Sequence, residues 1–166
     1  HTVVVDGNVI EAVGPDAHDF KVGDRVWGSN QGLLGRQGTC AQYAVVEQQW
    51  LYRTPKGVKN EDAAAISLVG ITAHKGLVRD AQLKKGEIVF VNGGAGGVGS
   101  TVVQMARILG AKVITTAGSE EKVQACLELG ADLAINYKTE DVAARIEQFA
   151  PEGVHVWWET LREPDF

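Results

Sequence analysis

The residues best suited to chemistry form a glycine-rich run, Gly93-Gly94-Ala95-Gly96-Gly97-Val98-Gly99, called here the glycine loop. The spacing G-x-G-x-x-G falls on Gly94, Gly96 and Gly99. Glycine permits a tight turn, sometimes with a positive φ, and lets backbone N–H groups approach a pyrophosphate. A helix that starts in the loop would add the partial positive charge of its N-terminus. The pattern favours a dinucleotide site, and the alternative is a strand-to-helix turn that needs small residues for packing only.

The end of the second strand in such a site decides between NAD and NADP. NAD-binding proteins place Asp or Glu there, which bonds the ribose 2′-OH and would repel a 2′-phosphate. Here the position is Ala117, and the next residues are Gly118, Ser119, Glu120, Glu121 and Lys122. A hydroxyl and an ammonium from Ser119 and Lys122 suit a phosphate, which predicts NADPH. Two alternatives stay open. Lys122 could be a solvated surface lysine, and Glu120 or Glu121 could be the carboxylate that binds the ribose. Glutamate in a first helical turn is, however, also stabilised by the helix dipole.

Strands and helices in regular alternation must position these residues. The predicted strands are 87–92, 112–116, 133–136 and 154–158, and the predicted helices are 97–109, one that ends at 129, and one over the apolar positions 142–149. Ser119 and Thr139 are the predicted N-caps of the second and third helices, and Gly130 stops the second. This order predicts an α/β fold, a Rossmann-type parallel sheet of four strands with right-handed crossovers.

The first third of the chain has a different pattern. Short strands are predicted at 2–5, 9–13, 24–27 and 39–47, separated by turns rich in glycine. From Asn60, a predicted N-cap, the pattern becomes helical. We therefore expect a partial β-barrel over residues 1–55, followed by the dinucleotide-binding domain over residues 56–166.

Composition narrows the class of protein. The 166 residues are 45% hydrophobic and 22% charged, with a formal net charge of −5, as in a folded globular protein. Scattered basic residues argue against nucleic acid as a partner, and no apolar stretch is long enough to predict a membrane span. The two cysteines, Cys40 and Cys126, are expected to be small apolar residues in a reducing, cytoplasmic setting. Because His1 is not Met, we expect the chain to begin inside a longer gene product.

Several spaced motifs resemble the medium-chain dehydrogenase/reductase family, and in particular its zinc-independent quinone oxidoreductase branch, which includes zeta-crystallin. The resemblance rests on Gly-Asp-Arg-Val at 23–26, Ala-Ala-Ala at 63–65, Gly-Ile-Thr-Ala at 70–73, the glycine loop, Leu-Gly-Ala-Asp at 129–132 and Ile-Asn-Tyr at 135–137. It implies a GroES-like barrel joined to a Rossmann domain that binds NADPH. Family members extend beyond both ends of this chain, so the Rossmann domain is expected to be truncated at its C-terminus and the full-length form to be a homodimer.

Site residues follow from the resemblance by position. It implies that Ala95, Gly96, Gly97 and Val98 surround the pyrophosphate and that Gly118, Ser119 and Lys122 surround the 2′-phosphate. Tyr137 is expected to flank the adenosine and Thr72 to approach the nicotinamide, whereas the alternatives are that Tyr137 covers a sheet edge and that Thr72 bonds its own helix.

The expected activity is hydride transfer from NADPH to a small-molecule acceptor, a quinone or an α,β-unsaturated carbonyl. The zinc-binding branch carries ligands where this chain has valines at 3–5, and also a four-cysteine lobe, so no metal is expected. No catalytic residue can be assigned. Asn30, Gln31 and Tyr43 are speculative candidates for the substrate cleft, and a noncatalytic NADP(H)-binding module, or an inactive fragment, is the alternative to an enzyme.

Overall fold

The chain forms two compact units, unit 1 (His1–Leu68) and unit 2 (Val69–Phe166), in the computed structural model. The structure describes residues 1–29 and 31–160. The boundary between the units falls within helix α1 (Asn60–His74), whereas the predicted functional division after residue 55 stays a prediction. No helix in the described part of the chain is long and apolar enough to cross a membrane.

Unit 1 contains two small antiparallel sheets, the partial barrel of the prediction. Strands β1 (Thr2–Asp6), β2 (Val9–Val13) and β4 (Tyr43–Glu47) form one sheet in the order β2-β1-β4. Strands β3 (Val26–Gly28) and β5 (Leu51–Arg53) form the other, and a 3₁₀ turn (Gln48–Trp50) precedes β5. Alternate residues point into the core, as the two-residue period of a strand requires. The inward residues of β1 and β4 are Val3, Val5, Ala44 and Val46.

The loops of unit 1 differ from the prediction. Strand β3 starts at Val26 and β4 at Tyr43, both later than expected, and β5 was not predicted. Two glycines of the connecting loop, Gly32 and Gly35, have φ of 83° and 79°, a left-handed conformation that interrupts extended structure. Strand β5 has only three residues, too few for a visible alternation of polar and apolar positions.

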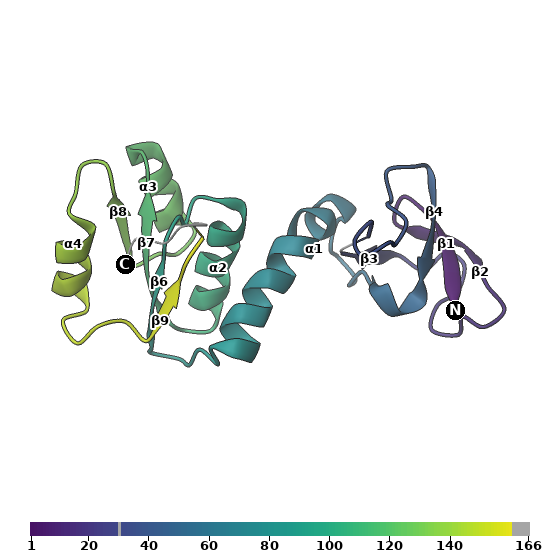
Figure 1. Ribbon diagram of the computed structural model, residues 1–166, viewed down its shortest axis with the longest axis horizontal. Coiled ribbons are helices and arrows are strands. Elements are labelled where there is room, and N and C mark those ends of the chain that lie inside the picture. Colours follow the sequence, from purple (N-terminus) through teal and green to yellow (C-terminus); the bar gives the residue numbers. More distant parts are fainter. Residues whose placement is uncertain (30, 161–166) are drawn as a thin grey trace. The chain divides into compact units, whose positions relative to one another are not determined.

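Unit 2 has the predicted Rossmann-type arrangement, a parallel sheet of four strands in the order β8-β7-β6-β9 (Figure 1). The strands are β6 (Ile88–Val91), β7 (Lys112–Ala117), β8 (Leu133–Asn136) and β9 (Val156–Trp158). The connecting helices are α2 (Gly97–Ile108), α3 (Glu120–Glu128) and α4 (Val142–Phe149). Each strand begins and ends within two residues of its predicted bounds.

Both faces of this sheet are covered, which is why its strands are largely apolar. On one face Val89, Val91 and Val113 pack with Val102 and Ala106 of α2. The opposite face carries other strand residues, Phe90, Ile114 and Ile135, and packs against α4. Figure 1 shows α4 and α2 on opposite sides of the strands.

Helix ends follow the predicted capping at two positions and depart from it at two others. Ser119 caps α3, and Gly130 follows α3 with φ 106°, as predicted. The predicted cap Thr139 is wrong, because Asp141 accepts the bond from the Ala144 N–H, at 3.1 Å, that caps α4. The predicted cap Asn60 is the first helical residue of α1, and its side-chain amide instead bonds Arg25 and Asn8.

A π-helical segment, Lys75–Asp80, follows α1 and was not predicted. The ring of Trp158 fills the space beside Gly76, where an added Cβ would lie 2.2 Å from the indole. Leu77 is fully buried in the same region. Packing against β9 therefore accompanies this unusual helical turn.

Candidate functional site: the glycine loop and its neighbours

The glycine loop connects the carboxyl end of β6 to the first turn of α2. Gly96 is the N-cap, and no side chain among the described residues caps this end of the helix. The Gly96 carbonyl accepts from the Ser100 N–H at 2.8 Å, which starts the helical hydrogen bonding. The N–H groups of the first turn and the helix dipole thus favour an anion at this end.

Two glycines of the motif are required by packing. A Cβ at Gly94 would lie 2.1 Å from Thr115 Oγ1, and one at Gly99 would lie 2.1 Å from the Gly93 carbonyl oxygen. Both distances are far inside van der Waals contact, so β6, β7 and α2 approach each other only because these side chains are missing.

Gly96 differs from both. A Cβ there would meet only the Gly93 carbonyl oxygen, at 3.4 Å, and would otherwise point into open space. Its φ is −79°, whereas the left-handed residue of the loop is Gly93, with φ 84°. The Rossmann turn takes its left-handed step at the strand end, which leaves Gly96 in an extended conformation that any residue could adopt. The absence of a side chain at Gly96 is therefore unexplained by folding.

Gly118 and Tyr137 lie together beyond the carboxyl ends of β7 and β8. The Tyr137 N–H donates to the Ala117 carbonyl at 3.1 Å. A Cβ at Gly118 would lie 2.5 Å from the Tyr137 hydroxyl oxygen. The Tyr137 side chain is 54% exposed, and Ala117 is buried. An aromatic ring accessible to a ligand thus borders the position where an acid would mark an NAD site.

Ser119 and Lys122 occupy the start of α3, directly after Gly118. The Ser119 hydroxyl oxygen accepts from the Lys122 backbone N–H at 3.4 Å, and its own proton remains a donor. Lys122, Glu120 and Glu121 are exposed. The residues predicted to contact the phosphate thus lie together at the start of α3, and Ser119 also caps this helix.

Thr72 lies in the part of α1 that belongs to unit 2. Val69, one turn earlier, has a methyl carbon 3.8 Å from the position of a Cβ at Gly97. Residues three apart share a helix face, and Thr72 is exposed. The structure thus brings the α1 face that carries Thr72 to the glycine loop.

A polar network behind the loop was not predicted. Asn92, after β6, donates from Nδ2 to both carboxylate oxygens of Glu159, after β9, at 3.1 Å each. Its Oδ1 accepts from the Thr116 hydroxyl at 2.7 Å. Polar residues at the ends of three neighbouring strands were the available signal, because those ends meet at one edge of a parallel sheet.

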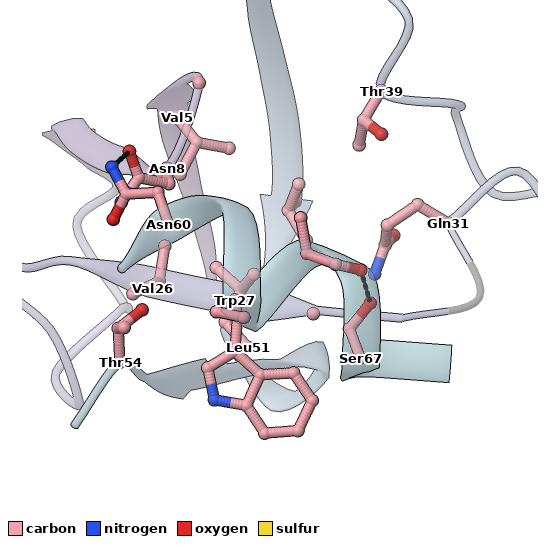
Figure 2. Close-up of a pocket in the computed structure, with 15 residues that line it drawn as sticks. Val5, Asn8, Val26, Trp27, Gln31, Thr39, Leu51, Thr54, Asn60 and Ser67 are labelled. Atoms are coloured by element: carbon pink, nitrogen blue, oxygen red, sulfur yellow. Dashed lines mark hydrogen bonds between the residues drawn. The ribbon is translucent and has the colours of Figure 1, made fainter. Parts of the chain in front are cut away.

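Unit 1 contains a separate cavity of about 250 Å³, shown in Figure 2. Its lining includes Asn8, Gln31, Thr54 and Asn60. Asn8 Nδ2 and Thr54 Oγ1 are buried and have no hydrogen-bond partner among the described residues. Of the three speculative cleft residues, Gln31 lines this cavity, the exposed Tyr43 is not among its lining residues, and Asn30 lies outside the described residues. The predicted cofactor residues all belong to unit 2.

The cysteines and potential metal ligands add little to the site. Cys126 is buried, and burial raises the pKa of its thiol. Cys40 is exposed and lies in the glycine-rich loop before β4 rather than in the strand expected there. Among residues 1–29 and 31–160, no three His, Cys, Asp or Glu side chains are grouped to hold a metal ion.

Comparisons with known proteins point to one family. Residues 97–166 match the family model described as zinc-binding dehydrogenase. The chain is 38% identical over 154 residues to a quinone oxidoreductase of Pongo abelii, covering 92% of this chain and 46% of the relative. It is 39% identical over 139 residues to the chloroplastic NADPH-dependent alkenal/one oxidoreductase of Arabidopsis thaliana, covering 81% of this chain and 36% of that relative.

A solved structure is similar as well. The quinone oxidoreductase of Escherichia coli, crystallised with NADPH, superposes with a TM-score of 0.77 and 32% identity, covering 86% of this chain and 43% of that one. The chain thus spans less than half the length of these relatives.

Proposed function

Because the chain belongs to the medium-chain dehydrogenase/reductase family, in its quinone oxidoreductase branch, we propose that it binds NADPH at the glycine loop and serves hydride transfer to a small organic acceptor. The open space at Gly96 carries the proposal. Folding does not require a glycine there, whereas a pyrophosphate seated on the first turn of α2 does.

The residues of unit 2 fit the cofactor along its length. The backbone N–H groups of Gly97 and Val98 would hold the pyrophosphate at the uncapped end of α2. The bare Cα of Gly118 makes room for the Tyr137 side chain, whose exposed ring would flank the adenosine. Thr72, on the face of α1 that reaches the loop, would approach the nicotinamide.

NADPH in preference to NADH is supported by the residues around the start of α3. Ala117 is buried and carries no carboxylate to bind a ribose 2′-OH. The Ser119 hydroxyl and the exposed Lys122 ammonium would donate to a 2′-phosphate. Two relatives are consistent with this choice: the A. thaliana enzyme is named NADPH-dependent, and the E. coli structure is a complex with NADPH.

NADPH, when bound, supplies a hydride. The protein has to hold the nicotinamide against an electron-poor acceptor and exclude water. We propose a quinone or an α,β-unsaturated carbonyl as the acceptor, because hydride addition to either gives a delocalised oxyanion that hydrogen bonds can stabilise without zinc. The names of the two curated relatives, a quinone oxidoreductase and an alkenal/one oxidoreductase, support both acceptor classes.

The wider organisation belongs to the same proposal. Residues 1–55 would be part of the GroES-like catalytic domain and residues 56–166 the Rossmann domain, in a cytoplasmic enzyme whose full-length form is a homodimer.

NADPH oxidation by the purified chain, followed at 340 nm with a quinone and with an enone as acceptors, tests the activity. Turnover with either acceptor supports the enzyme. NADPH binding without turnover would favour a noncatalytic NADP(H)-binding module, or an inactive fragment of such an enzyme. Failure to bind NADPH would exclude both the enzyme and the noncatalytic NADP(H)-binding module.

A further inference from the structure

A chain of hydrogen bonds connects the Glu159 carboxylate to the first residue of the glycine loop. Asn92 Nδ2 donates to both carboxylate oxygens at 3.1 Å, and Asn92 Oδ1 accepts from the Thr116 hydroxyl at 2.7 Å. The Thr116 oxygen in turn accepts from the Gly93 N–H at 2.9 Å. Thr116 is 2% exposed, so the hydrogen bonds in the middle of this series are shielded from water.

Every donor in this series of hydrogen bonds points toward the Glu159 carboxylate. The negative charge orients the Asn92 amide, because only the NH₂ group can face an anion, and this turns the amide oxygen toward Thr116. That oxygen fixes the direction of the Thr116 proton, which leaves the Thr116 lone pairs for Gly93. Hydrogen bonds aligned in this way polarise one another, and the effect is larger away from water. The charge at Glu159 therefore strengthens the bond at Gly93.

The peptide units at Gly93 determine where the rest of the loop lies. The Gly93 carbonyl accepts from the Gly96 N–H at 3.1 Å, and it sits where a side chain at Gly99 would be. The Gly94 N–H donates to the Thr116 carbonyl at 3.0 Å, so one residue of β7 holds two successive N–H groups of the loop. A shift at Gly93 is passed directly to Gly96 and the first turn of α2.

We propose that Glu159 is a positioning residue for the glycine loop, acting through Asn92 and Thr116 on Gly93. The role rests on the proposed NADPH site, because positioning matters only if the loop holds a pyrophosphate. The competing account is that Glu159 only fastens the end of β9 to the end of β6, which would affect stability without a selective effect on the loop.

The variant Glu159→Gln tests the charge, because glutamine keeps the shape and one acceptor oxygen. Glu152→Gln, at an exposed glutamate before β9, is the matched control. In the ¹H–¹⁵N spectrum without nucleotide, the Gly93 amide proton should move upfield in Glu159→Gln and stay in place in Glu152→Gln. The NADPH Kd should rise about 5-fold, the usual scale for replacing a charged partner by a neutral one. The Kd of adenosine 2′-monophosphate, which has no pyrophosphate, should not change.

Thr116→Val breaks the same series of hydrogen bonds at its middle and serves as the second variant. Because Glu159 acts through Thr116, adding Glu159→Gln to Thr116→Val should not weaken NADPH binding further. An unmoved Gly93 signal in Glu159→Gln, equal weakening of NADPH and adenosine 2′-monophosphate, or additive effects in the double variant would each overturn the positioning role. A wild-type chain that binds neither nucleotide would overturn the proposed function and this role with it, whereas an unmoved Gly93 signal with intact NADPH binding would overturn this role alone.

Discussion

Valine substitutions at two glycines of the loop should separate cofactor binding from folding. In Gly96→Val the new side chain occupies open space, and the φ of −79° suits valine. Valine is a poorer N-cap than glycine, so we expect a loss of about 1 kcal/mol in the free energy of unfolding. The side chain blocks the approach of a pyrophosphate to at least two backbone N–H groups, each worth roughly 1.5 to 3 kcal/mol to a charged partner. The NADPH Kd should therefore rise by more than about 100-fold.

Gly99→Val should behave in the opposite way. Its Cβ would lie 2.1 Å from a backbone oxygen that is itself bonded within the loop, so α2 must move away from β6. Overpacking of this kind costs typically 1 to 3 kcal/mol, and a β-branched side chain against fixed backbone belongs at the upper end. For a unit of this size each kcal/mol lowers Tm by roughly 4 to 8 °C. We expect Tm to fall by roughly 10 °C or more.

Circular dichroism melting and NADPH fluorescence titration, carried out on the same samples, measure both effects. Gly38→Val is the matched control, since Gly38 lies in unit 1 and a Cβ there meets nothing within 4 Å. Unchanged NADPH affinity in Gly96→Val would refute the pyrophosphate site. A Gly99→Val variant as stable as wild type would refute the packing argument.

Three further outcomes follow from the site and its surroundings. Lys122→Ala should raise the NADPH Kd roughly 5- to 150-fold, from the loss of about 1 to 3 kcal/mol, and should leave the NADH Kd near the wild-type value in calorimetric titrations. The control variant Lys112→Ala should bind both nucleotides as wild type does. An equal loss of NADH affinity in Lys122→Ala would contradict a phosphate contact. Because burial raises the pKa of the Cys126 thiol, a maleimide at pH 7 should modify only Cys40 in the native chain and both thiols in urea, counted by mass spectrometry; native labelling of Cys126 would show that it is accessible. Metal analysis should find no stoichiometric zinc and a chelator should leave activity intact, and one bound zinc whose removal abolishes activity would contradict the zinc-independent mechanism.

Local signals were sufficient for most of unit 2. The strands are largely apolar runs, and Ser119 and Gly130 are residues whose own chemistry begins and ends a helix. The prediction of Thr139 as the N-cap of α4 was wrong because Asp141, two residues later, is an equally good capping residue. The Thr139 and Glu140 N–H groups both bond the Asn136 carbonyl, which holds this segment in a turn and delays α4.

Contacts between distant segments could not be predicted in the same way. The π-helical turn accompanies the packing of Trp158 beside Gly76, and the bonds among Asn92, Thr116 and Glu159 need three strands side by side. The sequence motif marked Gly94, Gly96 and Gly99 as a set. Only the surrounding atoms distinguish the two needed for packing from the one that faces open space.

Calorimetric titration of the chain with NADPH and, separately, with NADH tests the central claim most directly. The account predicts one NADPH per chain, with a Kd at least about 10-fold lower than that of NADH, because only NADPH offers a 2′-phosphate to Ser119 and Lys122. NADH binding that equals or exceeds NADPH binding, or no binding of either, would contradict it.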